Sequence, residues 1–212
     1  HADDLNASDT GLVQRNLAAA RRIAALTLLC LDRRGVFLDE AGGTGLLVRL
    51  LRDRGLDFRW RDRYATNVFA RGFQATGGER RYEAITWLEC AEHVPDPLTT
   101  VSGLLRETDT LILTTQLLPS PAPQPDARWY YGWNHGQHVG FYSRRTFGAL
   151  AERLDVRCVS DGRSWHVLSR RRVSSLRLRL ALRLARPIDA LLGRALLRPR
   201  TESDHRSLVA SP

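Results

Sequence analysis

The first part of the sequence whose residue types and spacing suit ligand binding is a run of small residues behind an acidic pair. It reads Asp39-Glu40-Ala41-Gly42-Gly43-Thr44-Gly45 and separates a short apolar run from a segment with helical spacing. Gly43 and Gly45 remove side chains that would keep a ligand from the backbone, and the helix behind them presents free N–H groups. Asp62 ends the next apolar run, at a distance typical of a carboxylate that binds ribose hydroxyls. The combination indicates an adenosine-containing ligand, with a tight turn and an unrelated capping aspartate as the structural alternative.

A second cluster combines acids with imidazoles. Glu89, Glu92 and His93 stand at positions i, i+3 and i+4 behind an expected strand, so their side chains could converge on one side of a helical turn. His138 comes later in the chain, shortly before an expected helix. Such a set could hold a divalent metal or exchange protons directly. The structural alternative has Glu92 capping a helix and His93 packed in the core.

A long connection over residues 116–140 is the expected binding loop. It holds four prolines, followed by the aromatic residues Trp129, Tyr130, Tyr131 and Trp133. Loops of this length in a compact domain are typically lids or binding loops. The rings could stack on a sugar ring or a planar molecule, or form a small core beneath the loop.

The order of the elements indicates how these clusters could meet. The spacing of apolar residues, and the glycines, prolines and capping residues between them, predict helices over 10–30, 46–54, 63–70, 97–106 and 144–154. The same features predict strands over 36–39, 57–62, 82–88, 110–115, 155–159 and 165–168. Strands that alternate with helices predict an α/β, Rossmann-like fold with a mostly parallel sheet and helices on both faces. The last two strands are joined by a short turn, so they are expected to form a terminal antiparallel hairpin.

The charge divides the 212-residue chain into two parts. The net charge is +9, and all 32 basic residues are arginines. Residues 163–212 carry twelve arginines against three acids, so the rest of the chain is neutral, which argues against a nucleic-acid substrate. In this last part, Arg179, Arg183 and Arg186 lie on one side of a predicted amphipathic helix that is broken or restarted at Pro187. The leucines expected on the opposite side are Leu178, Leu180, Leu182 and Leu184.

Two partners suit this basic helix. It would either pack on the body or a second copy of the chain, or lie on an anionic membrane surface. No segment has the roughly 18 uncharged apolar residues of a membrane span. The three cysteines are far apart and odd in number, which excludes a disulfide framework. These features predict a cytoplasmic protein, with peripheral contact at the inner membrane face if the tail binds lipid.

The first cluster resembles the first motif of class I S-adenosylmethionine-dependent methyltransferases, which reads roughly L-D-x-G-x-G-x-G and is matched by residues 37–45. Asp62 matches that family's ribose-binding acid, and residues 89–97 resemble its E-x-x-E-H-x-x-D-P stretch. The similarity covers about residues 8–170 and looks closest to the small bacterial stand-alone branch. It implies a seven-stranded sheet in the order 3-2-1-4-5-7-6. The residues that would bind the cofactor are Asp39, Ala41, Gly43, Gly45, Asp62 and Leu88, although Ala41 stands where the family has its first glycine.

The resemblance also suggests a task for the second cluster. Similar acids and histidines hold a metal in small-RNA 2′-O-methyltransferases and in methyltransferases of ubiquinone biosynthesis. Methyl transfer is an in-line displacement at a sulfonium carbon, so a metal such as Mg²⁺ or Mn²⁺ could lower the pKa of a hydroxyl nucleophile. Its expected ligands are Glu89, Glu92, His93 and His138. Without a metal, His138, His93 and Glu92 are the expected catalytic residues.

The sequence therefore predicts a methyltransferase domain over residues 1–170 and a basic amphipathic tail over residues 171–212. The expected reaction moves a methyl group from S-adenosyl-L-methionine to an acceptor, with a hydroxyl of a small molecule or saccharide favoured. A nicotinamide-dependent oxidoreductase is the alternative enzyme, although its glycine loop usually lacks an acid at the position of Asp39. A non-catalytic binding protein that kept the fold is the alternative outside enzymes, and Ala41 is the residue that supports it.

Overall fold

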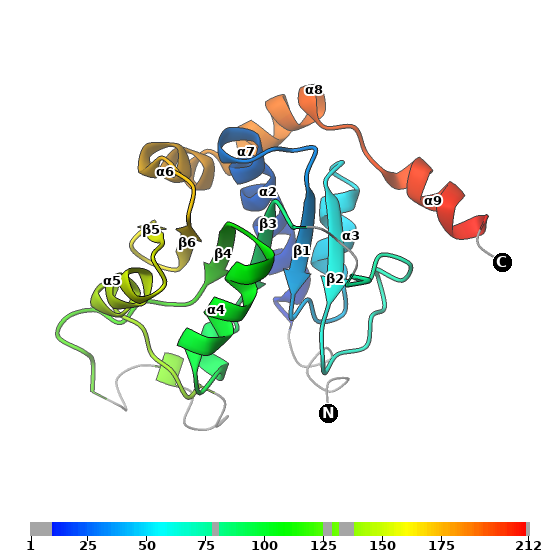
Figure 1. Ribbon diagram of the computed structural model, residues 1–212. Coiled ribbons are helices and arrows are strands. Elements are labelled where there is room, and N and C mark those ends of the chain that lie inside the picture. The colour runs from blue at the N-terminus through cyan, green and yellow to red at the C-terminus, as the bar shows by residue number, and fades with distance from the viewer. Residues whose placement is uncertain (1–9, 78–80, 125–128, 132–137, 211–212) are drawn as a thin grey trace.

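The computed structural model describes residues 10–77, 81–124, 129–131 and 138–210. One mixed sheet of six strands lies between two layers of helices (Figure 1), in the order β2-β1-β3-β4-β6-β5. The strands are β1 (Val36–Glu40), β2 (Asp57–Arg61), β3 (Ala84–Leu88), β4 (Thr110–Thr114), β5 (Arg157–Ser160) and β6 (Trp165–Ser169). The predicted α/β class is confirmed.

Four neighbouring strands of the sheet are parallel. β1 pairs in parallel with β2 and β3, and β3 pairs in parallel with β4. β6 lies antiparallel to β4, and β5 lies antiparallel to β6. Every residue of β4 is buried, as its run Thr-Leu-Ile-Leu-Thr predicts for a central strand. The carboxyl ends of the parallel strands therefore meet at one edge of the sheet, where β1 leads into the glycine cluster.

The predicted seventh strand and the helix over 63–70 are wrong for the described residues. The six strands keep the expected neighbours, but the outermost position beside β2 holds only one parallel bridge, between Trp60 and Gln74. Gly72 and Gly77 have positive φ on either side of this bridge, so the extended backbone is interrupted at both ends. The helix does not form because the backbone N–H groups of Val68 and Phe69 both donate to the carbonyl of Thr44.

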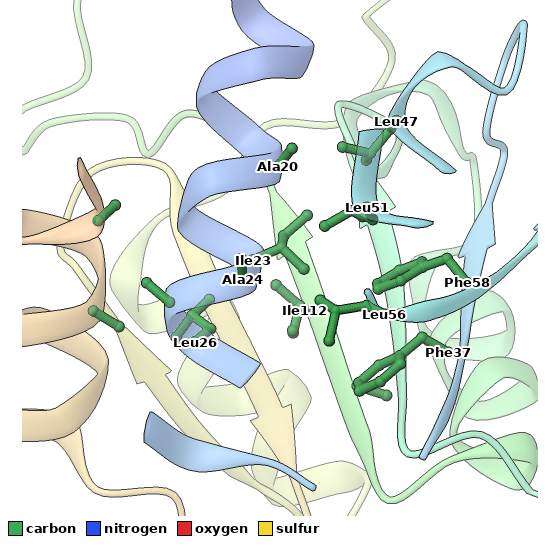
Figure 2. Packing of buried hydrophobic residues seen from close by; sticks show 14 of the residues in the cluster. Ala20, Ile23, Ala24, Leu26, Phe37, Leu47, Leu51, Leu56, Phe58 and Ile112 are labelled. Atoms are coloured by element: carbon green, nitrogen blue, oxygen red, sulfur yellow. The ribbon is translucent and has the colours of Figure 1, made fainter. Parts of the chain in front are cut away.

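Two hydrophobic cores hold the helices on the sheet. On one face, α2 (Leu12–Cys30), α3 (Leu46–Arg52) and α6 (Ser175–Arg183) cover β1, β2 and β4. Figure 2 shows Ile23 of α2, Leu51 of α3 and Ile112 of β4 in this core. On the other face, α4 (Pro97–Glu107) and α5 (Arg144–Arg153) cover β3 and β4. The Asp96 side chain accepts a hydrogen bond from the Thr99 N–H and so begins α4, as predicted.

The tail is helical, but its leucines do not share one face. Leu178 and Ala181 of α6 are fully buried beside α2, whereas Leu176, Leu180 and Leu184 are 66%, 41% and 46% exposed. Helical spacing places these three exposed leucines in one stripe, called the leucine ridge below. Beyond it lie α7 (Ala185–Ile188), a π-helical turn (Asp189–Gly193), α8 (Arg194–Leu196) and α9 (Thr201–Val209). The chain stays helical through Pro187, because Ile188 N–H still donates to the Leu184 carbonyl.

An ion-pair network ties α9 to the body. Arg52 of α3 is buried and donates two hydrogen bonds of 2.7 Å to the carboxylate of Asp204, which is also buried. Arg49 adds a third bond of 2.7 Å. Burial alone would raise the pKa of Asp204, but the hydrogen bonds from Arg52 and Arg49 outweigh it and lower that pKa. Within the described ranges, no helix is long and apolar enough to cross a membrane.

Candidate active site

The glycine loop behind β1 is held in a left-handed conformation. Ala41, Gly43 and Gly45 have φ values of 56°, 53° and 82°. A Cβ atom at Gly45 would come within 2.9 Å of Ala70 Cβ and Asn67 Oδ1, so a side chain does not fit there. A Cβ atom at Gly43 would meet no atom within 4 Å, because this residue faces open space. The loop therefore exposes backbone to a ligand at Gly43 and packs tightly at Gly45.

The end of β2 fixes the loop from the other side. Gly43 N–H donates to Asp62 Oδ2 at 2.9 Å, and Trp60 Nε1 donates to the Gly43 carbonyl at 2.9 Å. The other oxygen of Asp62 accepts hydrogen bonds from the N–H groups of Tyr64 and Ala65. Asp62 thus lies beside the loop, as its family motif implies, and it organises the loop backbone. Its contact with a ribose stays a prediction.

Asp39 is a buried acid at the foot of the loop. Its side chain is 3% exposed and accepts a 2.6 Å hydrogen bond from the Thr86 hydroxyl. Burial raises the pKa of Asp39 to about 7, a rise that Thr86 opposes and the nearby carboxylates of Glu40 and Asp62 increase. Within the described residues, no arginine or histidine forms an ion pair with it. A cationic ligand at this position would compensate the buried charge.

A cavity of about 1260 Å³ opens at the carboxyl edge of the parallel strands. One wall consists of Asp39 and the glycine loop, and another of the residues that follow β3 and β4. Leu88, predicted to bind the cofactor, lies on this second wall with Glu89. The volume exceeds the roughly 300–1,000 Å³ typical of a pocket for a single ligand, so the cavity has room for a cofactor and an acceptor.

Glu89 is separated from the other members of its predicted cluster. Its φ of 54° turns the chain sharply after β3, and Thr114 Oγ1 donates to Glu89 Oε1 at 2.8 Å. Glu89 is exposed and lines the cavity. The structure therefore places Glu89 on the cavity wall and outside the group formed by Glu92, His93 and His138.

Glu92, His93 and His138 do come together. Their potential ligand atoms lie within 4.8 Å of one another. The Val139 and Gly140 N–H groups donate to the Glu92 carbonyl, at 2.7 and 3.0 Å, and bring His138 to this position. His138 Nδ1 lies 2.7 Å from the Tyr130 carbonyl; because a carbonyl only accepts, Nδ1 carries the proton and Nε2 keeps its lone pair. Three of the four residues predicted as metal ligands are thus neighbours in the fold, and their binding of a metal stays a prediction.

Tyr130 lies between this cluster and the cavity. Its hydroxyl donates to Glu92 Oε1 at 3.1 Å and accepts from the N–H of Gln116, a residue of the cavity wall. Tyr130 is 2% exposed, so it forms part of a core beneath the loop, which was one of the two predicted roles of the aromatic residues. Trp133 and the side chain of Trp129 lie outside the described part of the chain.

No sequence pattern reveals the remaining walls of the cavity. Arg22 of α2, Ser143 and Arg144 at the start of α5, and Arg163 in the β5–β6 turn all line it. No motif joins these residues along the chain, since they meet only in the fold. Thr114 and Gln116 also line the cavity, and their place at the carboxyl end of a parallel strand was a signal that could have found them.

Comparison with known proteins identifies this arrangement. Residues 13–161 match the family model described as a methyltransferase domain. No curated protein sequence matches the chain significantly. Among solved structures, an O-methyltransferase family 2 protein from Planctomyces limnophilus DSM 3776 in complex with apigenin is 15% identical, with a TM-score of 0.56 over 81% of this chain and 62% of that one. An O-methyltransferase family protein from Burkholderia thailandensis is 14% identical, with a TM-score of 0.57 over 82% and 60%.

A third similar structure has a bound product. CalO1, a methyltransferase in calicheamicin biosynthesis in its SAH-bound form, is 12% identical, with a TM-score of 0.51 over 71% of this chain and 54% of that one. At these identities the likeness shows the fold, and the chain spans only about three fifths of the length of the first two structures. The family match covers most of the chain and includes the glycine loop, both acids and the acid–histidine cluster. The chain therefore belongs to the methyltransferase domain family of class I S-adenosylmethionine-dependent methyltransferases.

Proposed function

We propose that the chain transfers a methyl group from S-adenosyl-L-methionine to a hydroxyl of a small molecule or saccharide. The observation that carries this proposal is the glycine loop, which opens at Gly43 onto a cavity with space for two ligands. The O-methyltransferase neighbours support the choice of a hydroxyl. The neutral charge of the body and the concave site favour a small acceptor over a nucleic acid.

The residues at the loop fit this cofactor. When bound, S-adenosyl-L-methionine supplies a methyl group activated by a positively charged sulfur. The backbone at Gly43 is open to a ligand, and the buried carboxyl of Asp39 lacks a cationic partner within the described residues. A cation beside Asp39 would stabilise its charged form. Ala41 is exposed, so its methyl group is not covered by the protein and reduces the space at the cavity wall.

Glu89 is the carboxylate that reaches the acceptor space. A hydroxyl nucleophile must lose its proton as the methyl group is transferred, and a base near the hydroxyl assists this step. Glu89 lies on the cavity wall, and Thr114 orients its carboxylate through a 2.8 Å hydrogen bond. We assign Glu89 as proton acceptor in place of the metal-ligand role predicted from its sequence neighbours.

Glu92, His93 and His138 would hold a divalent cation behind Tyr130, since none of the three lines the cavity in the described part of the chain. Among the described residues, Glu92 Oε2 is buried without a hydrogen-bond partner, and the Tyr130 carbonyl engages His138 Nδ1, which leaves Nε2 as a ligand atom. One carboxylate oxygen and imidazole nitrogens suit Mn²⁺ better than Mg²⁺, which prefers oxygen. Such an ion would polarise a hydroxyl of an acceptor that extends past Tyr130. Calorimetric titration with Mn²⁺ should show one site that Glu92→Gln and His138→Ala abolish. Full activity in a chelator, with no Mn²⁺ binding, would leave these residues as metal-free acid and base.

Calorimetry with S-adenosylmethionine and S-adenosylhomocysteine tests the whole proposal. Both ligands should bind, and Asp39→Asn should weaken both. An absence of binding that Ala41→Gly does not rescue would favour a non-catalytic protein that kept the fold. An absorbance change of a nicotinamide during turnover would instead favour an oxidoreductase.

We also propose that the tail contacts an anionic membrane surface. The leucine ridge is exposed, and the arginines Arg177, Arg179 and Arg183 lie beside it on the same helix and are also exposed. Apolar groups bordered by cations match the acyl and headgroup layers of such a surface. Two copies of the ridge in contact would bring their arginines together, which disfavours self-association. Sedimentation with anionic vesicles tests this partner.

A further inference from the structure

The lining of the cavity is strongly basic. Five arginines line it, against the two acids Asp39 and Glu89. They come from three separate parts of the chain: Arg15 and Arg22 from α2, Arg144 and Arg145 from α5, and Arg163 from the β5–β6 turn. Arginines from separate elements therefore meet at one concave surface.

Most of these guanidinium groups have no carboxylate partner. Elsewhere, arginines of the body are neutralised by acids, as Arg61 is by Glu40 and Glu107. Within the described residues, no ion pair forms with Arg22, Arg144, Arg145 or Arg163. Unpaired cations around a partly enclosed cavity produce a positive potential that attracts anions.

Three of the arginines surround the turn between β5 and β6. The Arg22 guanidinium carbon lies 5.6 Å from the ring centre of Trp165, a contact that orients the group. A Cβ atom at Gly162 would lie 2.7 Å from Arg144 Nη2, so this guanidinium rests against the turn. Arg163 belongs to the turn itself, where Asp161 Oδ1 accepts three backbone N–H groups and keeps it rigid. The fold thus orients the guanidinium groups of Arg22 and Arg144 and holds the backbone that carries Arg163.

We infer that the acceptor carries an oxyanion, a phosphate or a carboxylate, which Arg22, Arg144 and Arg163 bind while its hydroxyl faces the cofactor. Guanidinium groups bind both anions through paired hydrogen bonds, so the shared chemistry is that of an oxyanion. The inference rests on the proposed function for the direction of the hydroxyl. The anion site itself requires only the arginines.

The test is calorimetric titration of inorganic phosphate, and separately of succinate, into protein saturated with S-adenosylhomocysteine. At least one anion should bind, and Arg22→Gln and Arg163→Gln should each weaken it at least tenfold. Arg153→Gln is the matched control, because Arg153 is exposed on α5 and lies outside the cavity lining. The anion that binds more tightly identifies the group on the acceptor. Absence of binding to the unaltered protein, or equal weakening by Arg153→Gln, would overturn the inference.

A second measurement separates the acceptor from the cofactor's own carboxylate. The affinities of S-adenosylhomocysteine and of methylthioadenosine, which lacks the amino-acid part, are compared in Arg22→Gln and Arg163→Gln. Both should stay within twofold of the unaltered protein. A tenfold loss for S-adenosylhomocysteine alone would show that the arginines serve the cofactor and would overturn the inference. If S-adenosylhomocysteine fails to bind while phosphate binding still depends on the arginines, the proposed function fails and the anion site stands.

Discussion

At the scale of single residues, the loop behind β1 combines a left-handed backbone with a side chain that strains it. Ala41 has a φ of 56°, which costs a residue with a Cβ atom about 1–2 kcal/mol relative to glycine. Asp39, two residues earlier, is buried with its pKa raised to about 7. Both features lower the stability of the cofactor-free protein at the place where a cofactor would bind. A change at either residue should therefore alter both stability and cofactor affinity.

Replacing Ala41 by glycine should stabilise the protein and strengthen cofactor binding. Relief of the left-handed strain exceeds the added freedom of glycine in the unfolded chain, which leaves a net gain of roughly 0.5–1 kcal/mol in the free energy of unfolding. Loss of the methyl group also widens the cavity wall. Urea denaturation and calorimetry with S-adenosylhomocysteine measure the two effects. Asp155→Gly is the control, since Asp155 has a φ of 49° away from the cavity and should change stability alone.

Cofactor affinity should rise with pH through the neutral range. The pKa of Asp39 lies near 7 in the free protein, so a cationic ligand that favours the carboxylate expels a proton on binding. The affinity for S-adenosylmethionine should therefore increase from about pH 6 to about pH 8 and then level off. The effect of Asp39 on stability runs the other way. Because its pKa is higher in the folded than in the unfolded protein, its contribution to the free energy of unfolding is lost as the pH rises toward 7.

Calorimetry at several pH values, repeated in buffers of different ionisation enthalpy, measures both the affinity and the released proton. Asp39→Asn should bind more weakly and show no such pH dependence. The same slope in Asp39→Asn and in the unaltered protein would assign the proton to another group.

At the scale of elements, the sequence predicted what depends on neighbours along the chain. The parallel core of the sheet follows from apolar runs that alternate with helical spacing, and Asp96 marked the start of α4. The absence of the expected helix over 63–70 was not predictable, since Val68 and Phe69 donate hydrogen bonds to Thr44 across the fold. Glu89 lies outside the predicted cluster for a similar reason, because Thr114 of β4 hydrogen-bonds both its carboxylate and its backbone N–H. Contacts between distant segments decided both cases.

The docking of α9 on α3 was also invisible in the sequence, and it should stabilise the fold. Asp204→Asn leaves the buried Arg52 with only Asp57 as an ionic partner and should lower the free energy of unfolding by about 3 kcal/mol. Urea denaturation measures this loss. Glu202→Gln on the same helix is the control, because the Glu202–Arg206 pair is exposed and worth little. Equal stability of the two variants would mean that α9 does not contribute to the folded body.

At the scale of the whole molecule, the two charged features lie at different places and serve different partners. The arginine wall belongs to the cavity at the carboxyl edge of the strands. The tail instead packs α6 on α2 and crosses to the end of α3, where Arg200 N–H donates to the Arg52 carbonyl. A surface bound to the tail would therefore leave the mouth of the cavity open to its ligands. Membrane contact and catalysis are compatible in this arrangement.

The leucine ridge should control binding to anionic vesicles. The triple change of Leu176, Leu180 and Leu184 to serine removes exposed apolar groups only, so folding should be unaffected while sedimentation with phosphatidylglycerol vesicles falls at least tenfold. High salt should weaken binding of the unaltered protein, since each nearby arginine contributes about 1 kcal/mol of screened attraction. Leu208→Ser, at an exposed leucine on α9, should bind normally. If the unaltered protein ignores vesicles and the triple change converts a dimer to a monomer in sedimentation equilibrium, the ridge is a contact between two copies of the chain and the membrane proposal is wrong.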